Sequence, residues 1–149
     1  MKITKELLNK WDACDEGITW FMGQNELDGL EIVKDLMGKD ATKNDWANWL
    51  IVRLMVKPQY VAYAICAAEQ VIGIYESKYP DDKRPRNAIE AAKAVLKNDT
   101  PAAGAAARAA SAAVDASAAV DAGDAARIKL QIKIFKYGIK LLETKEGTR

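Results

Sequence analysis

Residues 60–75, Tyr60-Val-Ala-Tyr-Ala-Ile-Cys-Ala-Ala-Glu-Gln-Val-Ile-Gly-Ile-Tyr75, decide the fold of this 149-residue chain. As a helix, the first nine of these residues would be apolar on nearly every side, so the helix has to lie inside other helices. Lys57-Pro58 and Pro80 bound it, because proline is tolerated in a first turn but breaks a helix interior. We therefore predict an all-α bundle of six or seven helices, a single domain over residues 1–149, around a central helix at about 58–79.

The composition is typical of a soluble globular protein. Half of the residues are hydrophobic and 29% are charged, with a net charge of +1. The longest apolar run, residues 61–68, is far shorter than the roughly 20 residues of a membrane-spanning helix, and the first residues lack the hydrophobic region of a signal peptide. We expect a cytoplasmic protein without a membrane partner. So small a net charge gives no general attraction to nucleic acid.

The chain has no histidine and only two cysteines, Cys14 and Cys66. Histidine is the commonest general base and metal ligand, and two isolated cysteines do not make a zinc site. The sequence also has no glycine-rich phosphate loop and no nucleophile elbow. We expect that the protein is not an enzyme and that it needs no metal or cofactor. Both thiols are expected to be reduced and packed as small apolar groups, with a redox pair as the alternative.

Three helices are predicted before the central one. The first begins at Thr4 as N-cap and runs through Cys14. It is expected to continue to a stop at Gly23, with Gly17 marking either a bend or a close contact. Asn25 is predicted to cap a second helix that ends at Met37.

The third predicted helix covers residues 45–55, with Thr42 or Asn44 as its cap. Trp46, Trp49 and Arg53 lie on or beside its apolar stripe. Arg53 is therefore a candidate partner for a buried carboxylate, or an arginine that extends to the rim of the core.

The central helix carries two polar residues in its middle, Glu69 and Gln70. A buried carboxylate needs a charged partner or a proton. We predict that Glu69 is buried and paired with one of three arginines, namely Arg53, Arg84 or Arg86. The carboxylate would then be either a clamp between core and turn or the floor of a pocket. One side of the helix is a stripe of small residues broken by this carboxylate: Ala62, Cys66, Glu69 and Gly73.

Residues 79–86, Tyr-Pro-Asp-Asp-Lys-Arg-Pro-Arg, have the densest run of charge and proline in the chain. Asp81 or Asp82 is predicted to cap the next helix, and Pro85 lies in its first turn. Lys83, Arg84 and Arg86 cluster where free N–H groups already favour anions, which makes them candidate anion-binding residues. The alternative is an ordinary surface turn, neutralised by its own aspartates.

The last third of the chain predicts two further helical stretches. Residues 102–126 are mostly alanine and contain a direct repeat, and alanine has the highest helix propensity. We expect this alanine-rich helix to pack on the small-residue side of the central helix. From Arg127 onward two apolar lines alternate with exposed lysines, at positions 129, 133, 136 and 140. Aligned lysines can bind phosphates, but at a net charge near zero and without aromatic platforms for stacking bases we do not expect a nucleic-acid partner.

Several phrases of the sequence are similar to one family. They are Ala13-Cys-Asp-Glu-Gly17, Trp20-Phe21, Asp45-Trp-Ala-Asn-Trp-Leu50, Tyr63-Ala-Ile-Cys-Ala-Ala-Glu-Gln-Val71, Tyr79-Pro-Asp-Asp-Lys-Arg-Pro-Arg-Asn-Ala-Ile-Glu-Ala-Ala-Lys93 and Lys133-Ile-Phe-Lys-Tyr-Gly138. With the alanine-rich segment, they resemble the small helical proteins labelled "putative immunity protein" that occur in bacteriophage genomes and bacterial loci. The resemblance implies a cytoplasmic protein that binds and neutralises a toxin or defence factor, and it carries no catalytic residues.

Two functional hypotheses follow. In the first, the chain is a non-enzymatic binding protein that occludes a partner protein. In the second, it binds a small anion or nucleotide in a basic and aromatic pocket. That pocket would combine the basic residues Lys83, Arg84 and Arg86 with the aromatic rings of Trp20, Trp46, Trp49 or Tyr75.

Overall fold

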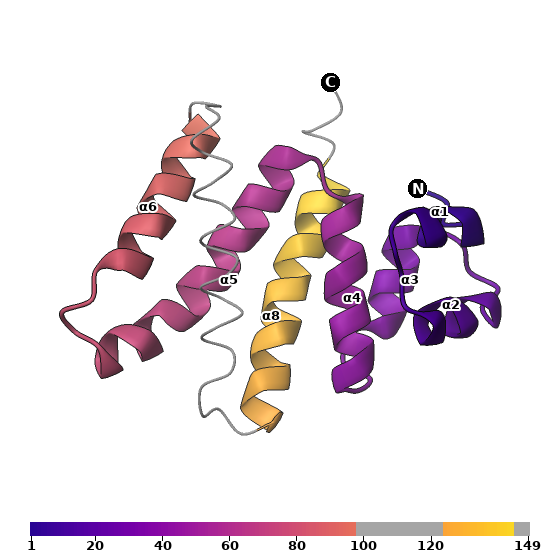
Figure 1. Cartoon of the computed structure of the whole chain (residues 1–149), viewed down its shortest axis with the longest axis horizontal. Coiled ribbons are helices and arrows are strands. Elements are labelled where there is room, and N and C mark those ends of the chain that lie inside the picture. Colours follow the sequence, from indigo (N-terminus) through magenta and orange to yellow (C-terminus); the bar gives the residue numbers. More distant parts are fainter. Residues whose placement is uncertain (98–123, 145–149) are drawn as a thin grey trace. The chain divides into compact units, whose positions relative to one another are not determined.

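The computed structural model of this chain describes residues 1–97 and 124–144. These residues form seven helices and no strand, which confirms the predicted all-α class (Figure 1). The chain divides into two compact units, Met1–Leu54 and Met55–Arg149. The first holds α1 (Lys5–Lys10), α2 (Asp15–Met22), α3 (Gly29–Leu36) and α4 (Ala41–Leu54), and the second holds α5 (Lys57–Lys78), α6 (Arg84–Lys97) and α8 (Asp124–Glu143).

The first predicted helix is two helices. Thr4 caps α1 as predicted, because its hydroxyl accepts the Leu7 N–H at 3.2 Å. The predicted continuation is wrong, since the chain breaks at Asp12, whose φ of 59° lies in the left-handed region that aspartate tolerates. At Gly17 the structure has the predicted close contact rather than a bend, because a Cβ atom there would lie 3.3 Å from the Cys14 sulfur. Cys14 is exposed rather than packed, and its thiol accepts the Gly17 N–H at 3.4 Å to start α2. That helix ends at Gly23, as predicted.

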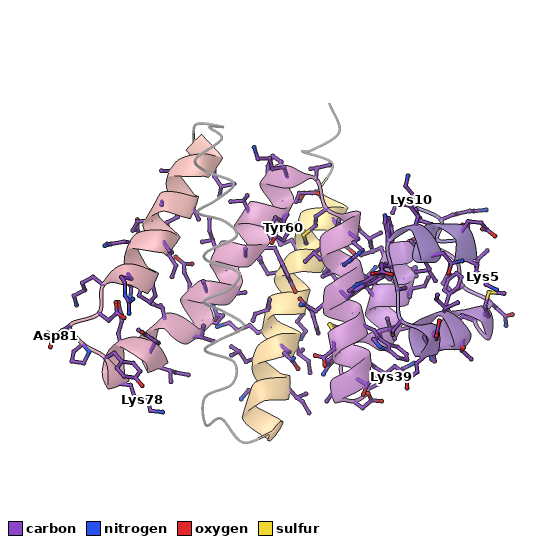
Figure 2. The ribbon with its side chains drawn as sticks, in the orientation of Figure 1. Lys5, Lys10, Lys39, Tyr60, Lys78 and Asp81 are labelled. Atoms are coloured by element: carbon purple, nitrogen blue, oxygen red, sulfur yellow. The ribbon has the colours of Figure 1, made fainter. Side chains whose placement is uncertain are left out.

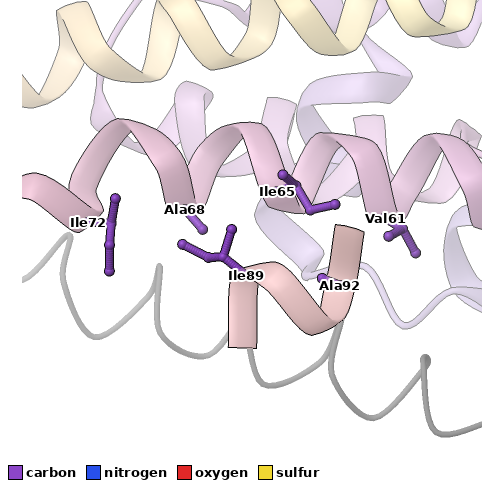
Figure 3. Close-up of a cluster of buried hydrophobic side chains, with 6 residues drawn as sticks. All are labelled: Val61, Ile65, Ala68, Ile72, Ile89 and Ala92. Carbon is purple, nitrogen blue, oxygen red and sulfur yellow. The ribbon is translucent and has the colours of Figure 1, made fainter. Parts of the chain in front are cut away.

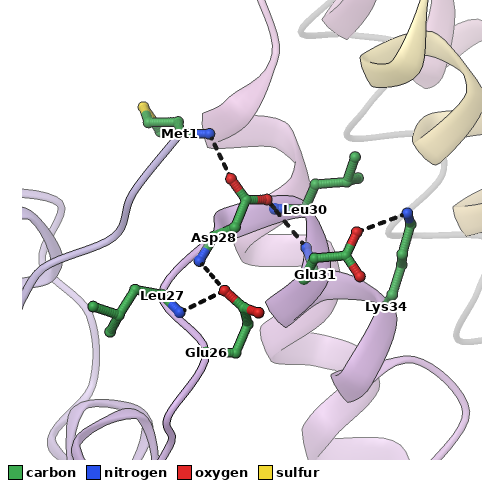
Figure 4. A network of polar contacts seen from close by, with 7 residues as sticks. All are labelled: Met1, Glu26, Leu27, Asp28, Leu30, Glu31 and Lys34. Carbon is green, nitrogen blue, oxygen red and sulfur yellow. Dashed lines mark hydrogen bonds and ion pairs between the residues drawn. The ribbon is translucent and has the colours of Figure 1, made fainter.

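Asp28, not Asn25, caps α3. Its Oδ1 accepts the Leu30 N–H at 3.0 Å and its Oδ2 lies 2.9 Å from the N-terminal ammonium (Figure 4). The preceding residues are held out of the helix by the N-terminal segment, because Ile3 donates to the Leu27 carbonyl at 2.7 Å. Asn25 therefore lies before the helix instead of capping it.

The helix α4 begins earlier than the sequence predicted. Asp40 rather than Thr42 or Asn44 caps it, since its carboxylate accepts the Lys43 N–H at 2.7 Å. Asn44 is fully buried, and its side-chain oxygen accepts the Gly38 N–H at 2.7 Å. Gly38 has a φ of 80°, so it makes the tight turn between α3 and α4, and Asn44 stabilises that turn.

In the second unit α5 is central, as predicted, and packs against both α6 and α8. Pro58 lies in its first turn and Pro80 follows its end at Lys78. A cluster of buried aliphatic side chains joins α5 to α6 (Figure 3); its members are Val61, Ile65, Ala68, Ile72, Ile89 and Ala92. The two neighbours α6 and α8 lie on opposite sides of α5 (Figures 1 and 3).

The C-terminal helix α8 has the predicted lysine stripe. Its four lysines at positions 129, 133, 136 and 140 are exposed, whereas Phe135 is 1% exposed. Gln59 of α5 donates to the Leu141 carbonyl at 2.6 Å, which fixes one end of α8 against α5. Residues 102–123 of the predicted alanine-rich helix, and with them its packing, lie outside the described residues. Within residues 1–97 and 124–144, no helix has the length and apolar character to cross a membrane.

Candidate functional site

The predicted anion-binding turn joins α5 to α6 and is held by its own acidic residue. Asp82 lies two residues before Arg84, the first residue of α6, and its carboxylate accepts the Arg84 N–H at 3.0 Å and both Nε (2.9 Å) and Nη2 (2.6 Å) of the Arg84 guanidinium. Tyr75 donates its hydroxyl to the same carboxylate at 2.8 Å. The hydrogen bonds from Arg84 and Tyr75 hold the pKa of Asp82 well below its ordinary value. Asp82 therefore neutralises Arg84 and fixes its orientation.

The other two basic residues of the turn also have partners. Arg86 donates its Nε to Glu76 at 2.9 Å and its Nη2 to the second oxygen of that carboxylate, a two-point pair that lowers the pKa of Glu76. Lys83 donates to the Pro80 carbonyl at 2.7 Å. An anion would have to displace these partners. The geometry thus favours the alternative of a neutralised surface turn.

The prediction for Glu69 is wrong in both respects. Its side chain is 42% exposed, and its carboxylate lies 3.0 Å from the Lys93 ammonium of α6. Glu69 does not belong to the buried cluster that joins α5 to α6, although its ion pair with Lys93 also links these two helices. The small-residue stripe is likewise not uniformly covered, because Ala62 and Cys66 are half-buried whereas Gly73 is exposed.

A sequence signal for these ion pairs was missed. Glu76 and Arg86 are each five residues from Asp81, and Glu69 and Lys93 are each twelve residues from it. In an antiparallel helix pair both chains advance with the same rise, so residues equally spaced from the turn lie side by side. With the turn placed at Asp81, this equal spacing would have predicted both ion pairs, Glu76 with Arg86 and Glu69 with Lys93.

The end of the α5–α6 hairpin exposes apolar and aromatic side chains beside this network. Ile74 is 50% and Tyr79 is 53% exposed, and the Tyr79 ring centroid lies 4.9 Å from that of Tyr75. The Arg84 side chain is 89% exposed although its head group is paired. Lys78 and Asp81 mark this end in Figure 2. We call the group Ile74, Tyr75, Tyr79, Asp82 and Arg84 the hairpin tip.

The remaining predicted site residues, Trp46, Trp49 and Arg53, belong to the first unit. The Arg53 guanidinium carbon lies 3.7 Å from the Trp49 ring centroid, and the guanidinium donates to the carbonyls of Trp49 (3.0 Å) and Trp11 (3.5 Å). Burial lowers the pKa of Arg53, with the Asp12 charge opposing that shift. Lys43 covers Trp46, with Nζ 4.0 Å from the ring centroid. The predicted pocket is therefore not formed within one unit, because Lys83, Arg84 and Arg86 belong to the second unit and the tryptophans to the first.

The described residues contain no group of three side chains that could hold a metal ion. Both thiols are free of disulfides, and burial raises the pKa of the half-buried Cys66.

A family model described as "Imm-5 like putative immunity protein" matches residues 52–132, more than half of the chain. The matched stretch includes all of α5 and α6 and the first part of α8, and it therefore lies almost wholly in the second unit. No curated protein and no solved structure matches the sequence.

Proposed function

Because this chain belongs to the family of Imm-5 like putative immunity proteins, we propose that it is a non-enzymatic binding protein that neutralises a toxin or defence protein by direct contact. The family match carries this proposal. The partner is a protein, and no chemical step by the chain is required. The matched residues 52–132 include the complete α5–α6 hairpin, so the contact surface is sought there first.

Within the hairpin, we propose the hairpin tip as the contact surface. Tyrosine and arginine dominate the energetics of protein interfaces because each covers a large area and adds a polar contact. Tyr79 and Arg84 are well exposed, and Asp82 fixes Arg84 before any partner arrives. A side chain that is already ordered loses less entropy on binding. Ile74 adds exposed apolar area beside them.

The experiment starts with the tagged chain as bait in a lysate of the cells that carry its gene. Each captured protein is then expressed alone, to test whether it stops growth, and again together with the chain. We expect a captured protein that stops growth and whose effect the chain relieves. If every captured protein is harmless, or the chain relieves none of them, the proposed function is wrong.

Paired variants test the contact surface. Tyr79→Ala combined with Arg84→Ala removes a tyrosine and a cation from the hairpin tip. Tyr137→Ala combined with Lys136→Ala removes the same chemistry from α8, where Tyr137 is 36% exposed. The tip variant should bind the captured toxin at least about tenfold more weakly and lose growth protection, whereas the α8 variant should keep both. Equal binding by the two variants would place the contact elsewhere.

A further inference from the structure

The first unit contains a cavity of about 290 Å³ between its four helices, and neither the family match nor the proposed function accounts for it. Its lining is mostly apolar and aromatic and includes Ile3, Leu8, Phe21, Trp20, Trp46 and Trp49. Its volume is close to the lower limit of about 300 Å³ for ligand pockets.

Local sequence features keep this space open. Gly17 lines the cavity, and a Cβ atom there would lie 3.3 Å from the Cys14 sulfur and 3.8 Å from the Trp46 ring. Asp12 and Ala13 form another part of the lining, at the break between α1 and α2 where Asp12 has its positive φ. A continuous helix through this region, as the sequence first predicted, would place these residues differently.

The charged residues of the lining are both acidic, Asp12 and Asp45. The neighbouring cations Lys43 and Arg53 cover the rings of Trp46 and Trp49 but do not line the cavity. Arg53 lies close enough to Asp12 for their charges to interact, so Asp12 is partly compensated. Asp45 is exposed and has no ion pair within the described residues. Asp45 is thus the carboxylate available to a ligand.

We propose that this cavity binds a small organic cation with an apolar aromatic body, an arylalkylammonium. The apolar lining would bury the aromatic body, and the ammonium would lie at the edge near Asp45, with Asp12 adding to the negative potential. Indole faces attract cations through their quadrupole, but all three lining tryptophans already lie near a cation of the chain, Lys43 over Trp20 and Trp46 and Arg53 over Trp49. The attraction for the ligand's ammonium is therefore assigned to the Asp45 carboxylate. An anion would meet two carboxylates, and a neutral ligand would lose the charge attraction.

The test uses three probes of one shape: phenethylammonium, phenethyl alcohol and hydrocinnamate. All four tryptophans of the chain, Trp11, Trp20, Trp46 and Trp49, lie in this unit, so intrinsic fluorescence of the full chain reports binding. At low ionic strength we expect saturable binding of phenethylammonium, at least about fivefold tighter than the alcohol, with hydrocinnamate the weakest. No saturable change with phenethylammonium, or equal binding of the three probes, would overturn the proposal.

Three variants locate the site. Asp45→Asn should remove most of the preference for the cation, whereas Glu16→Gln, which deletes an exposed charge of the same unit outside the lining, should keep it. Ala13→Leu adds volume to the lining and should weaken all three probes, with circular dichroism confirming a helical fold. If Asp45→Asn and Glu16→Gln alter the preference equally, or Ala13→Leu binds like the original chain, the cavity is not the site. Because the test involves no partner protein, its result is independent of the proposed neutralising function.

Discussion

The Glu69 carboxylate lies 3.0 Å from the Lys93 ammonium on the exposed side of the α5–α6 hairpin. Lys93 also lies 2.8 Å from Glu90, so it serves two carboxylates, and these hydrogen bonds raise its pKa. All three side chains are more than a third exposed, which leaves solvent to compete for each of them. The carboxylate in the middle of the central helix α5 is therefore a surface residue.

We predict that Glu69→Gln leaves the melting temperature within about 2 °C of the original chain, since exposed ion pairs contribute little. Thermal unfolding followed by circular dichroism measures this. Glu90→Gln is the matched control, because it removes the other partner of the same lysine. A large drop in melting temperature for Glu69→Gln alone would mean that the carboxylate is buried after all.

A second prediction concerns the start of α3. Asp28→Ala should lower the free energy of unfolding by about 1 kcal/mol, the usual cost of losing an N-cap. The substitution leaves the Leu30 and Glu31 N–H groups without their acceptor and the N-terminal ammonium without its partner. Asn25→Ala, at the cap predicted from sequence, should change little. Urea unfolding followed by tryptophan fluorescence compares the two, and a larger effect at Asn25 would support the sequence-based cap.

The comparison of Asp28 with Asn25 illustrates which features of the fold can be predicted from the sequence. The all-α class and several helix ends follow from local signals, namely the apolar periodicity of α5 and α8 and the stops at Gly23 and Pro80, whereas the break between α1 and α2 does not. Local signals do not predict the caps at Asp28 and Asp40. Several polar residues precede each helix, and tertiary contacts determine which of them becomes the cap. The backbone hydrogen bonds between residues 1–3 and residues 27–29 make Asp28 the N-cap of α3. These two segments are far apart in the sequence.

The candidate sites were harder to predict for the same reason. Charge and aromaticity identified Arg84, Arg86, Trp46 and Trp49 as noteworthy, but the signals are local and do not say which residues share a surface. Grouping them in one pocket was an assumption, and the structure places the arginines and the tryptophans in different units. The lining of the cavity in the first unit combines residues from all four of its helices or their flanks, so no single sequence motif predicts it.

A third prediction concerns alkaline pH. Tyr63 of α5 is buried, and burial raises the pKa of its phenol far above the ordinary value of about 10. Above pH 10 the unfolded chain loses this proton while the folded chain keeps it, so the unfolded state binds fewer protons and stability falls as the pH rises. The contribution of the Tyr63 phenol to the free energy of unfolding is therefore fully present below about pH 10 and is lost progressively above it.

The measurement is the free energy of unfolding in urea at a series of pH values above 9. Tyr63→Phe should make the decline shallower, and Tyr79→Phe, which removes the hydroxyl of a tyrosine that is 53% exposed, is the comparison variant. Tyr75 and Tyr137 also have raised pKa values, so part of the decline should remain in every variant. Identical slopes for the original chain and Tyr63→Phe would show that Tyr63 ionises as freely when folded as when unfolded.

The last prediction compares two glycines in helices. Gly73 is an exposed residue inside α5, where a Cβ atom would meet nothing within 4 Å among the described residues. Gly73→Ala should therefore raise the free energy of unfolding by about 0.5 to 1 kcal/mol, because alanine loses less backbone entropy on folding. Gly29, the first residue of α3, is buried, and a Cβ there would lie 2.8 Å from a Leu54 methyl carbon and 3.1 Å from one of Ile3.

Gly29→Ala should therefore lower the free energy of unfolding by about 1 to 2 kcal/mol, since Ile3 is 1% exposed and has little room to move. The opposite signs make each variant the control of the other, because both add one methyl group to a helix. Urea unfolding followed by circular dichroism gives both values. A stabilising Gly29→Ala would mean that Leu54 and Ile3 rearrange easily, and a destabilising Gly73→Ala would mean that another part of the chain covers this side of α5.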